Sequence, residues 1–228
     1  MISVIMSAYN DENNVKLAIE SIQNQSYQDF EFLIMDDFSS DNTFEICKNY
    51  SNEDDRITVY QNNSNLGLTK SLNKLLESAK GDYIARQDSD DISLSERFSK
   101  QIKFISENKL DGSTTRAIVK NSLKVTPNKS FYFPKKLIMK IKNPFIHGSL
   151  ILSKNSLEDI GGYDEKFYYA QDYKLLSDLL SKDFKLKILK EEQYILNLSD
   201  NISTKFKDKQ KYYANCVKKG INPIENIK

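Results

Sequence analysis

The chain has 228 residues, which is enough for one large domain or for one domain with an appendage. Charged residues make up 29% of it but the net charge is +1, so no overall field would draw the protein to nucleic acid. Cys47 and Cys216 lack any CxxC or histidine-paired spacing, which excludes a structural zinc site and indicates a reducing compartment. Neither a signal-peptide pattern nor an apolar run of membrane-spanning length is visible, so we expect a cytoplasmic protein.

The first ninety residues alternate short apolar runs with helical patterns. The apolar runs, which are predicted strands, lie at residues 1–8, 30–35, 57–61 and 83–86. Apolar residues recur every three or four positions over 12–26, 43–50 and 68–79. Because parallel strands need crossover connections, this order predicts an α/β fold with a doubly wound, mainly parallel sheet and helices on both faces.

The second half of the chain is less regular. We expect helices at 92–106, after Pro134, and at 153–160, and strands at 117–125, 145–152, 184–189 and 193–197. The strand at 145–152 would carry His147, the single histidine of the chain. A lone histidine on a strand is more often a hydrogen-bonded core residue than a metal ligand.

Three carboxylates, Asp88, Asp90 and Asp91, follow the fourth predicted strand. They lie past its carboxyl end, where open α/β sheets bind their ligands. Asp88 and Asp90 can point to one side of an extended backbone while Ser89 points away. Two hard oxygen ligands suit Mg²⁺ or Mn²⁺, which are usually held by one or two carboxylates and the phosphates of a substrate. The alternative is an acidic loop that caps the next helix, with Asp91 or Ser93 at the N-cap.

Polar residues also follow the other strands, and in a parallel sheet these strand ends gather on one edge. Tyr9 and Asn10 follow the first strand, and Asp37 follows the second. Tyr9 could stack on a ring or be a half-buried core residue, and Asp37 could accept from a base N–H or form an Asx-turn. No glycine-rich phosphate loop is present, so diphosphate binding would depend on the metal, with Lys70 or Arg86 in support.

A further carboxylate, Asp172, begins a predicted helix that follows the loop at Gly161-Gly162. The helix dipole stabilises an acidic residue in a first turn, and this needs no function. The functional interpretation is a general base at the mouth of the same cleft.

Taken together, these motifs resemble the inverting family 2 glycosyltransferases of the GT-A type, which use nucleotide sugars. The resemblance covers about residues 2–198 and rests on four segments in family order, at residues 3–10, 34–41, 88–90 and 161–172. It implies a GT-A (Rossmann-like) domain over 1–200, with a nucleotide-binding half at 1–110 and an acceptor-side half at 111–200. Gln171 stands where many members have glutamate, and the chain has no tryptophan.

The resemblance also implies roles for individual residues. Tyr9 would stack on the base, Asp37 would accept from uracil N3–H, and Asp172 would be the catalytic base. Asp90, with Asp88, would hold Mn²⁺ or Mg²⁺, and His147 falls where some members carry a further metal ligand. The donor-binding residues that it implies are Ala8, Tyr9, Asn10, Asp37, Lys70, Arg86, Asp88 and Ser89.

The activity implied by the resemblance is metal-dependent transfer of a hexosyl or N-acetylhexosaminyl group from a UDP-sugar to a hydroxyl of a glycan or glycolipid. Its context would be the synthesis of a bacterial surface polysaccharide or lipooligosaccharide. Inversion needs no covalent nucleophile, in agreement with the lack of a Ser-His or Cys-His constellation. A non-catalytic nucleotide-sugar-binding module and a nucleotidyltransferase are the alternatives.

The tail at 201–228 is basic. From Lys205 it carries seven lysines against two acids, with aromatic residues interleaved. We expect a helix there that is either solvated or in peripheral contact with the anionic inner surface of a membrane.

Overall fold

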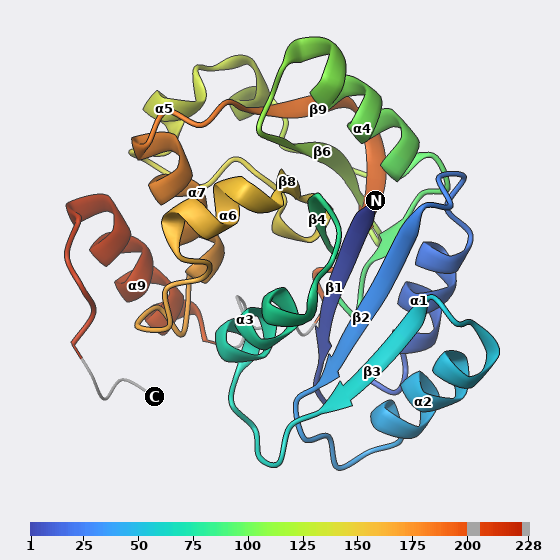
Figure 1. The fold of residues 1–228 in the computed structure, drawn as a ribbon. Helices are drawn as coiled ribbons and strands as arrows, with labels where there is room; N and C mark the ends of the chain where they lie inside the picture. Colours follow the sequence, from blue (N-terminus) through green and yellow to red (C-terminus); the bar gives the residue numbers. More distant parts are fainter. Residues whose placement is uncertain (200–205, 225–228) are drawn as a thin grey trace.

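The structure is a computed structural model that describes residues 1–199 and 206–224. Its centre is a nine-stranded sheet with the order β3-β2-β1-β4-β8-β6-β9-β5, and β7 pairs with β6. Helices surround this curved, mixed sheet on both faces (Figure 1). The α/β class predicted from the sequence is confirmed.

The first half contains the predicted parallel strands and their crossover helices. The strands are β1 (Ile2–Ala8), β2 (Phe30–Asp36), β3 (Ile57–Gln61) and β4 (Tyr83–Arg86). The helices between them are α1 (Val15–Gln23), α2 (Thr43–Glu53) and α3 (Leu68–Ser78). Ala8 pairs with Asp36, and Arg86 pairs with Ile5, so the carboxyl ends of β1, β2 and β4 lie along one edge of the sheet.

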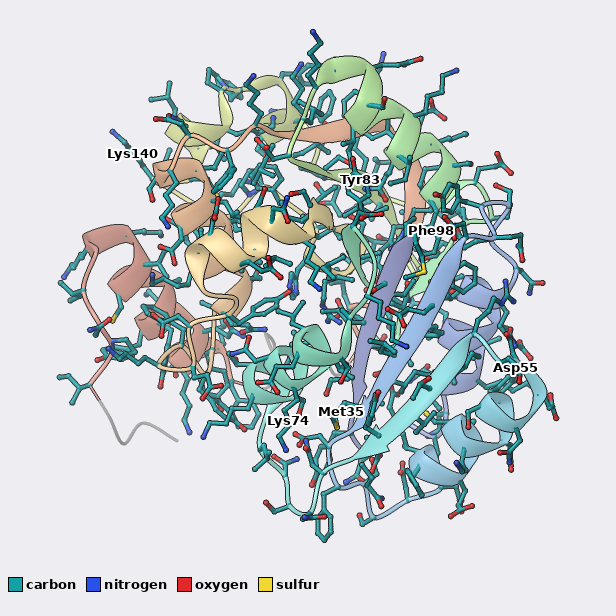
Figure 2. The ribbon with its side chains drawn as sticks, in the orientation of Figure 1. Met35, Asp55, Lys74, Tyr83, Phe98 and Lys140 are labelled. Carbon is teal, nitrogen blue, oxygen red and sulfur yellow. The ribbon has the colours of Figure 1, made fainter. Side chains whose placement is uncertain are left out.

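Side chains of these strands alternate between two hydrophobic cores, one on each face of the sheet. Val4 of β1 packs in the core that contains α1, α2 and α4, whereas Ile5 packs in the core that contains α3, α6, α7 and α9. Met35 and Phe98, both labelled in Figure 2, belong to these two different cores. Burial on both faces is what crossover helices impose on a parallel sheet, and it explains the near-continuous apolar runs.

The segment at 145–152 is not the continuous strand that the sequence predicts. Residues His147–Ser149 form the 3₁₀ turn η2, and only Ile151–Ser153 forms a strand, β8, antiparallel to β4. The backbone N–H and the hydroxyl of Ser149 both donate to the Ile146 carbonyl oxygen, at 3.1 and 2.9 Å. Since an extended backbone cannot form this turn, His147 does not lie on a strand.

Strand boundaries in the rest of the second half also differ from the prediction. The predicted strand at 117–125 is a hairpin of β6 (Gly112–Val119) and β7 (Val125–Thr126). The two strands predicted at 184–189 and 193–197 are one long strand, β9 (Leu186–Leu196). Its polar stretch at 190–192 stays in the sheet through a register shift opposite Arg116, which pairs with Glu192 at 2.9 Å.

The helix predicted at 92–106 begins later than expected. Ile92–Ser93 is the short strand β5, which pairs with β9, and α4 spans Arg97–Asn108. Pairing with a strand a hundred residues away outweighs the local helical pattern. The remaining helices are η1 (Lys129–Tyr132), α5 (Lys135–Ile138), α6 (Lys154–Ile160), α7 (Gln171–Ser181) and α9 (Lys207–Lys219).

Within the basic tail, Lys207–Lys219 form helix α9 and residues 220–224 are not helical, whereas residues 200–205 and 225–228 lie outside the described part. Helix α9 packs against the core with Tyr213, Cys216 and Val217 buried. The Tyr213 ring lies 6.2 Å from that of Phe167 and 5.5 Å from that of Tyr169. The apolar side of α9 is therefore buried against the core of the domain and does not face a membrane. Within residues 1–199 and 206–224, no helix is long and apolar enough to span a bilayer.

Candidate active site

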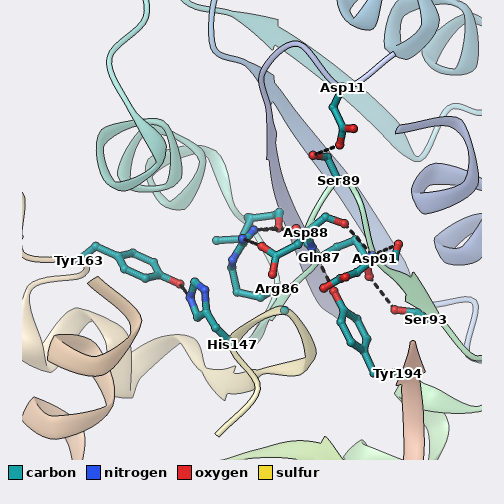
Figure 3. Close-up of polar contacts among 12 residues, drawn as sticks. Asp11, Arg86, Gln87, Asp88, Ser89, Asp91, Ser93, His147, Tyr163 and Tyr194 are labelled. Carbon is teal, nitrogen blue, oxygen red and sulfur yellow. Dashed lines mark hydrogen bonds and ion pairs between the residues drawn. The ribbon is translucent and has the colours of Figure 1, made fainter. Parts of the chain in front are cut away.

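Arg86, at the end of β4, fixes the first carboxylate of the loop that follows. Its side chain is 1% exposed. Its Nη1 donates to the carbonyl oxygens of Ile5, at 2.7 Å, and Gln87, at 2.8 Å. Its Nη2 pairs with the Asp88 carboxylate (Figure 3). In this structure Arg86 therefore orients the Asp88 carboxylate. The predicted contact of Arg86 with a diphosphate stays a prediction.

The loop at 87–91 is held from inside by residues that the sequence did not single out. The Gln87 amide donates to the carbonyl oxygens of Asp88, at 3.0 Å, and Asp91, at 2.9 Å. The Asp88 backbone N–H donates to the hydroxyl of Tyr194 on β9, at 3.2 Å. Tyr194 is fully buried and lies 106 residues away along the chain, so no local pattern could connect it with this loop.

A second buried arginine, Arg97 of α4, ties the same loop to its neighbours. Its guanidinium donates to Ser93 Oγ at 2.9 Å, to the Gly148 carbonyl oxygen at 3.0 Å and to the Arg86 carbonyl oxygen at 2.8 Å. Buried cations persist in proteins when they are hydrogen-bonded in this way. Arg97 therefore joins β4, β5 and η2 behind the carboxylates.

Asp91 and Ser93 are not helix caps, contrary to the alternative reading of the acidic loop. Ser93 lies in β5, and α4 begins only at Arg97. Asp91 is buried, and its Oδ1 accepts from the Asn197 backbone N–H at 2.6 Å. Burial raises the pKa of its carboxyl group, and the charges of Asp88 and Asp90 raise it further. Asp91 therefore anchors the end of β9 beneath the loop.

Asp90 lies in a strongly negative environment. Its pKa is raised to about 7, first by burial and then by the charges of Asp88 and Asp11, while Lys120 opposes the shift. Asp11 was not predicted to belong to the site. Ser89 points toward it and donates to its carboxylate at 2.6 Å, as Figure 3 shows. Like charges this close disfavour ionisation, and a divalent cation would relieve their repulsion.

The donor set fits a hard divalent cation that the substrate helps to coordinate. No three Asp, Glu, His or Cys side chains in the described part of the chain converge as a metal site. Mg²⁺ and Mn²⁺ do not require such a set, because one or two carboxylates with waters and phosphate oxygens usually suffice. Asp88 and Asp90 can supply those two carboxylates, and His147 does not complete a three-residue site with them.

His147 instead pairs with a tyrosine. Its Nε2 lies 2.8 Å from the hydroxyl oxygen of Tyr163, and the two rings meet edge to face (Figure 3). Burial, and next the positive charge of Arg86, lower the pKa of His147 to about 4. The imidazole is therefore neutral near pH 7. Its predicted role as a metal ligand stays a prediction.

Asp172, the predicted base, is held by a neighbouring amide and acts on the same two rings through its charge. It lies in the first turn of α7, and its Oδ2 accepts from the Asn143 side-chain amide at 2.8 Å. The charges of Asp172, Arg86 and Asp88 all act on His147 and on Tyr163. The charges of Asp88 and Asp172 therefore both reach this buried pair, although 84 residues separate the two in the chain.

A cavity of about 420 Å³ opens beside Asn143. Asn143, which holds Asp172, is one of its lining residues, and Lys129 and Lys142 line it as well. Neither Asn143 nor this cavity was foreseen, because the loop around residues 125–146 has no regular pattern in sequence.

The predicted base-binding residues lie at the ends of β1 and β2. Tyr9 is 50% exposed, as a stacking platform would require. Asn10 takes a positive φ of 49°, donates its N–H to Ser39 Oγ and accepts from the Ser40 N–H. The Ala8 carbonyl oxygen accepts from the Asp37 N–H at 2.9 Å. These bonds hold the two strand ends together.

Asp37 has a structural task at this edge. It is 2% exposed and accepts from the Asn62 amide and from the backbone N–H groups of Leu66 and Gly67, at 2.8–2.9 Å. Its contact with uracil stays a prediction. Tyr168 was not predicted, yet its ring lies so close to Gly67 that a Cβ atom there would come within 2.5 Å of it. Lys70 is exposed in the first turn of α3.

Known proteins resemble this chain in sequence and in fold. The model of "Glycosyl transferase family 2" matches residues 3–161. The chain belongs to this family. It is 32% identical to the uncharacterized glycosyltransferase MJ1057 of Methanocaldococcus jannaschii, over 94% of this chain and 77% of that protein.

Two further relatives of this chain come from bacteria. The putative glycosyltransferase EpsE of Bacillus subtilis is 38% identical over 71% of this chain, which spans 59% of EpsE. The Escherichia coli protein WfaP, named UDP-Glc:alpha-D-GlcNAc-diphosphoundecaprenol beta-1,3-glucosyltransferase, is 29% identical over 91% of this chain and 82% of its own length.

A solved structure confirms the fold. The crystal structure of S. aureus TarS 1-349 in complex with UDP matches with a TM-score of 0.76 over 98% of this chain and 67% of that one. The sequence identity is 23%, so this likeness concerns the fold alone. The family 2 domain has the GT-A, Rossmann-like fold that the sequence motifs implied.

Proposed function

We propose that this family 2 glycosyltransferase moves a sugar from a UDP-sugar to a hydroxyl group of a glycan or glycolipid, with inversion and with a divalent cation, in surface polysaccharide synthesis. The observation that carries the proposal is that Asp88 packs against Gly148, next to His147, while the charges of Asp88 and Asp172 both act on the His147–Tyr163 pair. The name of WfaP, a relative over most of its length, supports a UDP-sugar donor and a lipid-linked acceptor.

The chain's own residues suit each part of such a transfer. The exposed Tyr9 ring would stack on the base, and Asp88 and Asp90 would hold Mn²⁺ or Mg²⁺. When bound, the cation would stabilise the charge that develops on the departing diphosphate. The acceptor would enter through the cavity lined by Asn143.

Asp172 would act as the base of the single displacement. The acceptor oxygen forms a bond to the anomeric carbon, the bond from that carbon to the diphosphate oxygen breaks, and Asp172 takes the hydroxyl proton. Asn143 positions the carboxylate by donating to Oδ2, which leaves Oδ1 for the acceptor. No covalent sugar–enzyme intermediate is needed.

Calorimetric titration of the protein with UDP, with and without Mn²⁺, tests the nucleotide and the metal together. We expect Mn²⁺ to strengthen UDP binding by at least about tenfold, because the cation bridges the carboxylates and the diphosphate. Tyr9→Ala should weaken binding about tenfold with and without the metal, because stacking is lost in both cases. Binding of UDP that ignores Mn²⁺, or no binding at all, would contradict the proposal.

Gly148→Ala is expected to displace Asp88, because a side chain at this position would clash with Asp88 and with Tyr194. A Cβ atom there would lie 2.3 Å from the Tyr194 hydroxyl oxygen and 2.6 Å from an Asp88 carboxylate oxygen. Both groups must move, so we expect a loss of about 1–3 kcal/mol in the free energy of unfolding and weaker Mn²⁺-dependent UDP binding. Denaturant unfolding and the UDP titration measure the two effects.

Gly220→Ala is the matched control for this variant. Its Cβ atom would meet nothing within 4 Å, but the φ of 64° makes alanine unfavourable, at a cost of about 1 kcal/mol. Gly220→Ala should lose stability and keep its UDP affinity. If Gly148→Ala also keeps its affinity, the close packing behind Asp88 does not matter for the site.

A further inference from the structure

One surface on the acceptor side of the domain is strongly basic although the whole chain is nearly neutral. Between Asp111 and Glu158 the sequence contains nine lysines and arginines and no aspartate or glutamate, whereas the net charge of the chain is +1. Arg116 pairs with Glu192 and Lys136 with Asp183. Among residues 1–199 and 206–224, Lys129, Lys140 and Lys142 have no carboxylate within ion-pair distance. Positive charge is therefore in excess along this stretch of the chain.

The same stretch exposes large apolar side chains. Tyr132, Phe133, Leu137 and Ile141 are 56–73% exposed. Single exposed hydrophobic residues are ordinary on a protein surface, whereas exposed apolar residues that gather in one patch are typical of an interaction site.

The backbone arranges these residues into two rows. Helical hydrogen bonds continue past α5, since the Met139 N–H donates to the Lys135 carbonyl oxygen and the Lys142 N–H to that of Ile138. Met139 points into the core. Leu137 and Ile141 are four residues apart, as are Lys136 and Lys140, so each pair lies on one side of this helical segment. Figure 2 shows Lys140 at the outer edge of the molecule.

We propose that this basic–apolar surface docks on a lipid bilayer that contains anionic lipids. Its members are Lys129, Tyr132, Phe133, Leu137, Lys140, Ile141 and Lys142. The lysines match the anionic headgroups, and the aromatic and aliphatic side chains enter the boundary between headgroups and acyl chains. A soluble polyanion would use the lysines alone, so the exposed apolar side chains favour the bilayer.

The docking surface is joined directly to the base. Lys142 precedes Asn143, which donates to Asp172, and the hydroxyl of Tyr173 donates to the Met139 carbonyl oxygen. Both contacts reach the first turn of α7. A sugar carried on a membrane lipid would therefore arrive beside Asp172. The docking itself requires neither donor nor acceptor, so it does not rest on the proposed function.

Vesicle sedimentation with the full chain tests the proposal. The probes are vesicles of phosphatidylcholine alone, vesicles of phosphatidylcholine mixed with phosphatidylglycerol, and soluble polyphosphate as a competitor. We expect binding to the mixed vesicles, little binding to the neutral ones, and partial loss in high salt. Failure to bind the mixed vesicles would overturn the proposal.

Two sets of variants separate the apolar and the basic contributions. Replacing Phe133, Leu137 and Ile141 together by serine should weaken binding by about tenfold or more, and Lys129→Gln with Lys140→Gln should weaken it similarly. Matched controls are Leu17→Ser with Tyr60→Ser, which are exposed apolar residues of α1 and β3, and Lys207→Gln with Lys211→Gln on α9. The controls should bind as wild type does.

Circular dichroism shows that every variant is folded, so this result does not depend on UDP binding, which is the test of the proposed function. If the serine variant sediments with vesicles as wild type does and polyphosphate abolishes binding of both proteins, the surface recognises a polyanion and the proposal is wrong. If only the α9 variant loses vesicle binding, the basic tail makes the membrane contact, and this outcome would also overturn the proposal.

Discussion

Asp172→Asn is expected to reduce turnover by about 10²–10⁴-fold and to leave UDP affinity near the wild-type value. Asparagine keeps the size of the side chain and an oxygen that can accept from the Asn143 amide, so the geometry at the start of α7 should persist. It cannot take a proton from the acceptor. The loss should therefore fall on kcat and not on donor binding.

Slow hydrolysis of UDP-sugars in the presence of Mn²⁺ measures this effect without knowledge of the acceptor. Asp178→Asn is the control, because Asp178 lies on the same helix and pairs with Lys174 at 2.6 Å, away from the His147–Tyr163 pair. It should hydrolyse donors as wild type does. Unchanged hydrolysis by Asp172→Asn would remove Asp172 from the role of base.

Asp90→Asn is expected to abolish the effect of Mn²⁺ on UDP binding and to bring transfer below detection. Asp90 lies among Asp88 and Asp11, and this excess of negative charge is what a divalent cation would neutralise. Removing one of the charges weakens the attraction for the cation. UDP should then bind to the variant with Mn²⁺ only as well as it binds to wild type without it.

Thermal unfolding gives a second, independent measure for this variant. Mn²⁺ with UDP should raise the Tm of the wild-type protein and not that of Asp90→Asn. Without metal the variant should be at least as stable as wild type, since it has one fewer repelling charge. Asp82→Asn is the control, because Asp82 precedes β4 at its other end and is exposed beside the N-terminal amino group. A metal response retained by Asp90→Asn would show that another residue is the principal ligand.

The sequence was most informative where structure is local and repetitive. The four parallel strands of the first half are short apolar runs separated by amphipathic helices. Because both faces of these strands are buried, nearly all of their residues must be apolar, and such runs are easy to recognise. Their polar ends could be assigned to one edge because parallel strands point the same way. The family resemblance, confirmed by the match over residues 3–161, rested on these ends and on the segment at 161–172.

Prediction was wrong where a distant contact overrode the local pattern. Ile92 and Ser93 look like the start of a helix but pair with β9, and Asp91 looks like a cap but is buried beneath the end of that strand. His147 lies in a run that resembles a strand, but the chain turns there. In each case the free energy gained by packing and pairing with remote residues exceeds the local conformational preference of the segment.

By itself, the sequence determined the family, the α/β fold class and the carboxylates to consider. Only the tertiary structure decided which groups surround them, namely Tyr194 and Gly148 behind Asp88, Asp11 beside Asp90 and Asn143 on Asp172. It also decided that the tail's apolar side is buried while an apolar surface is exposed around α5. The physical reason is that burial and charge environment depend on contacts between residues far apart in the chain, which periodicity and motif spacing do not encode.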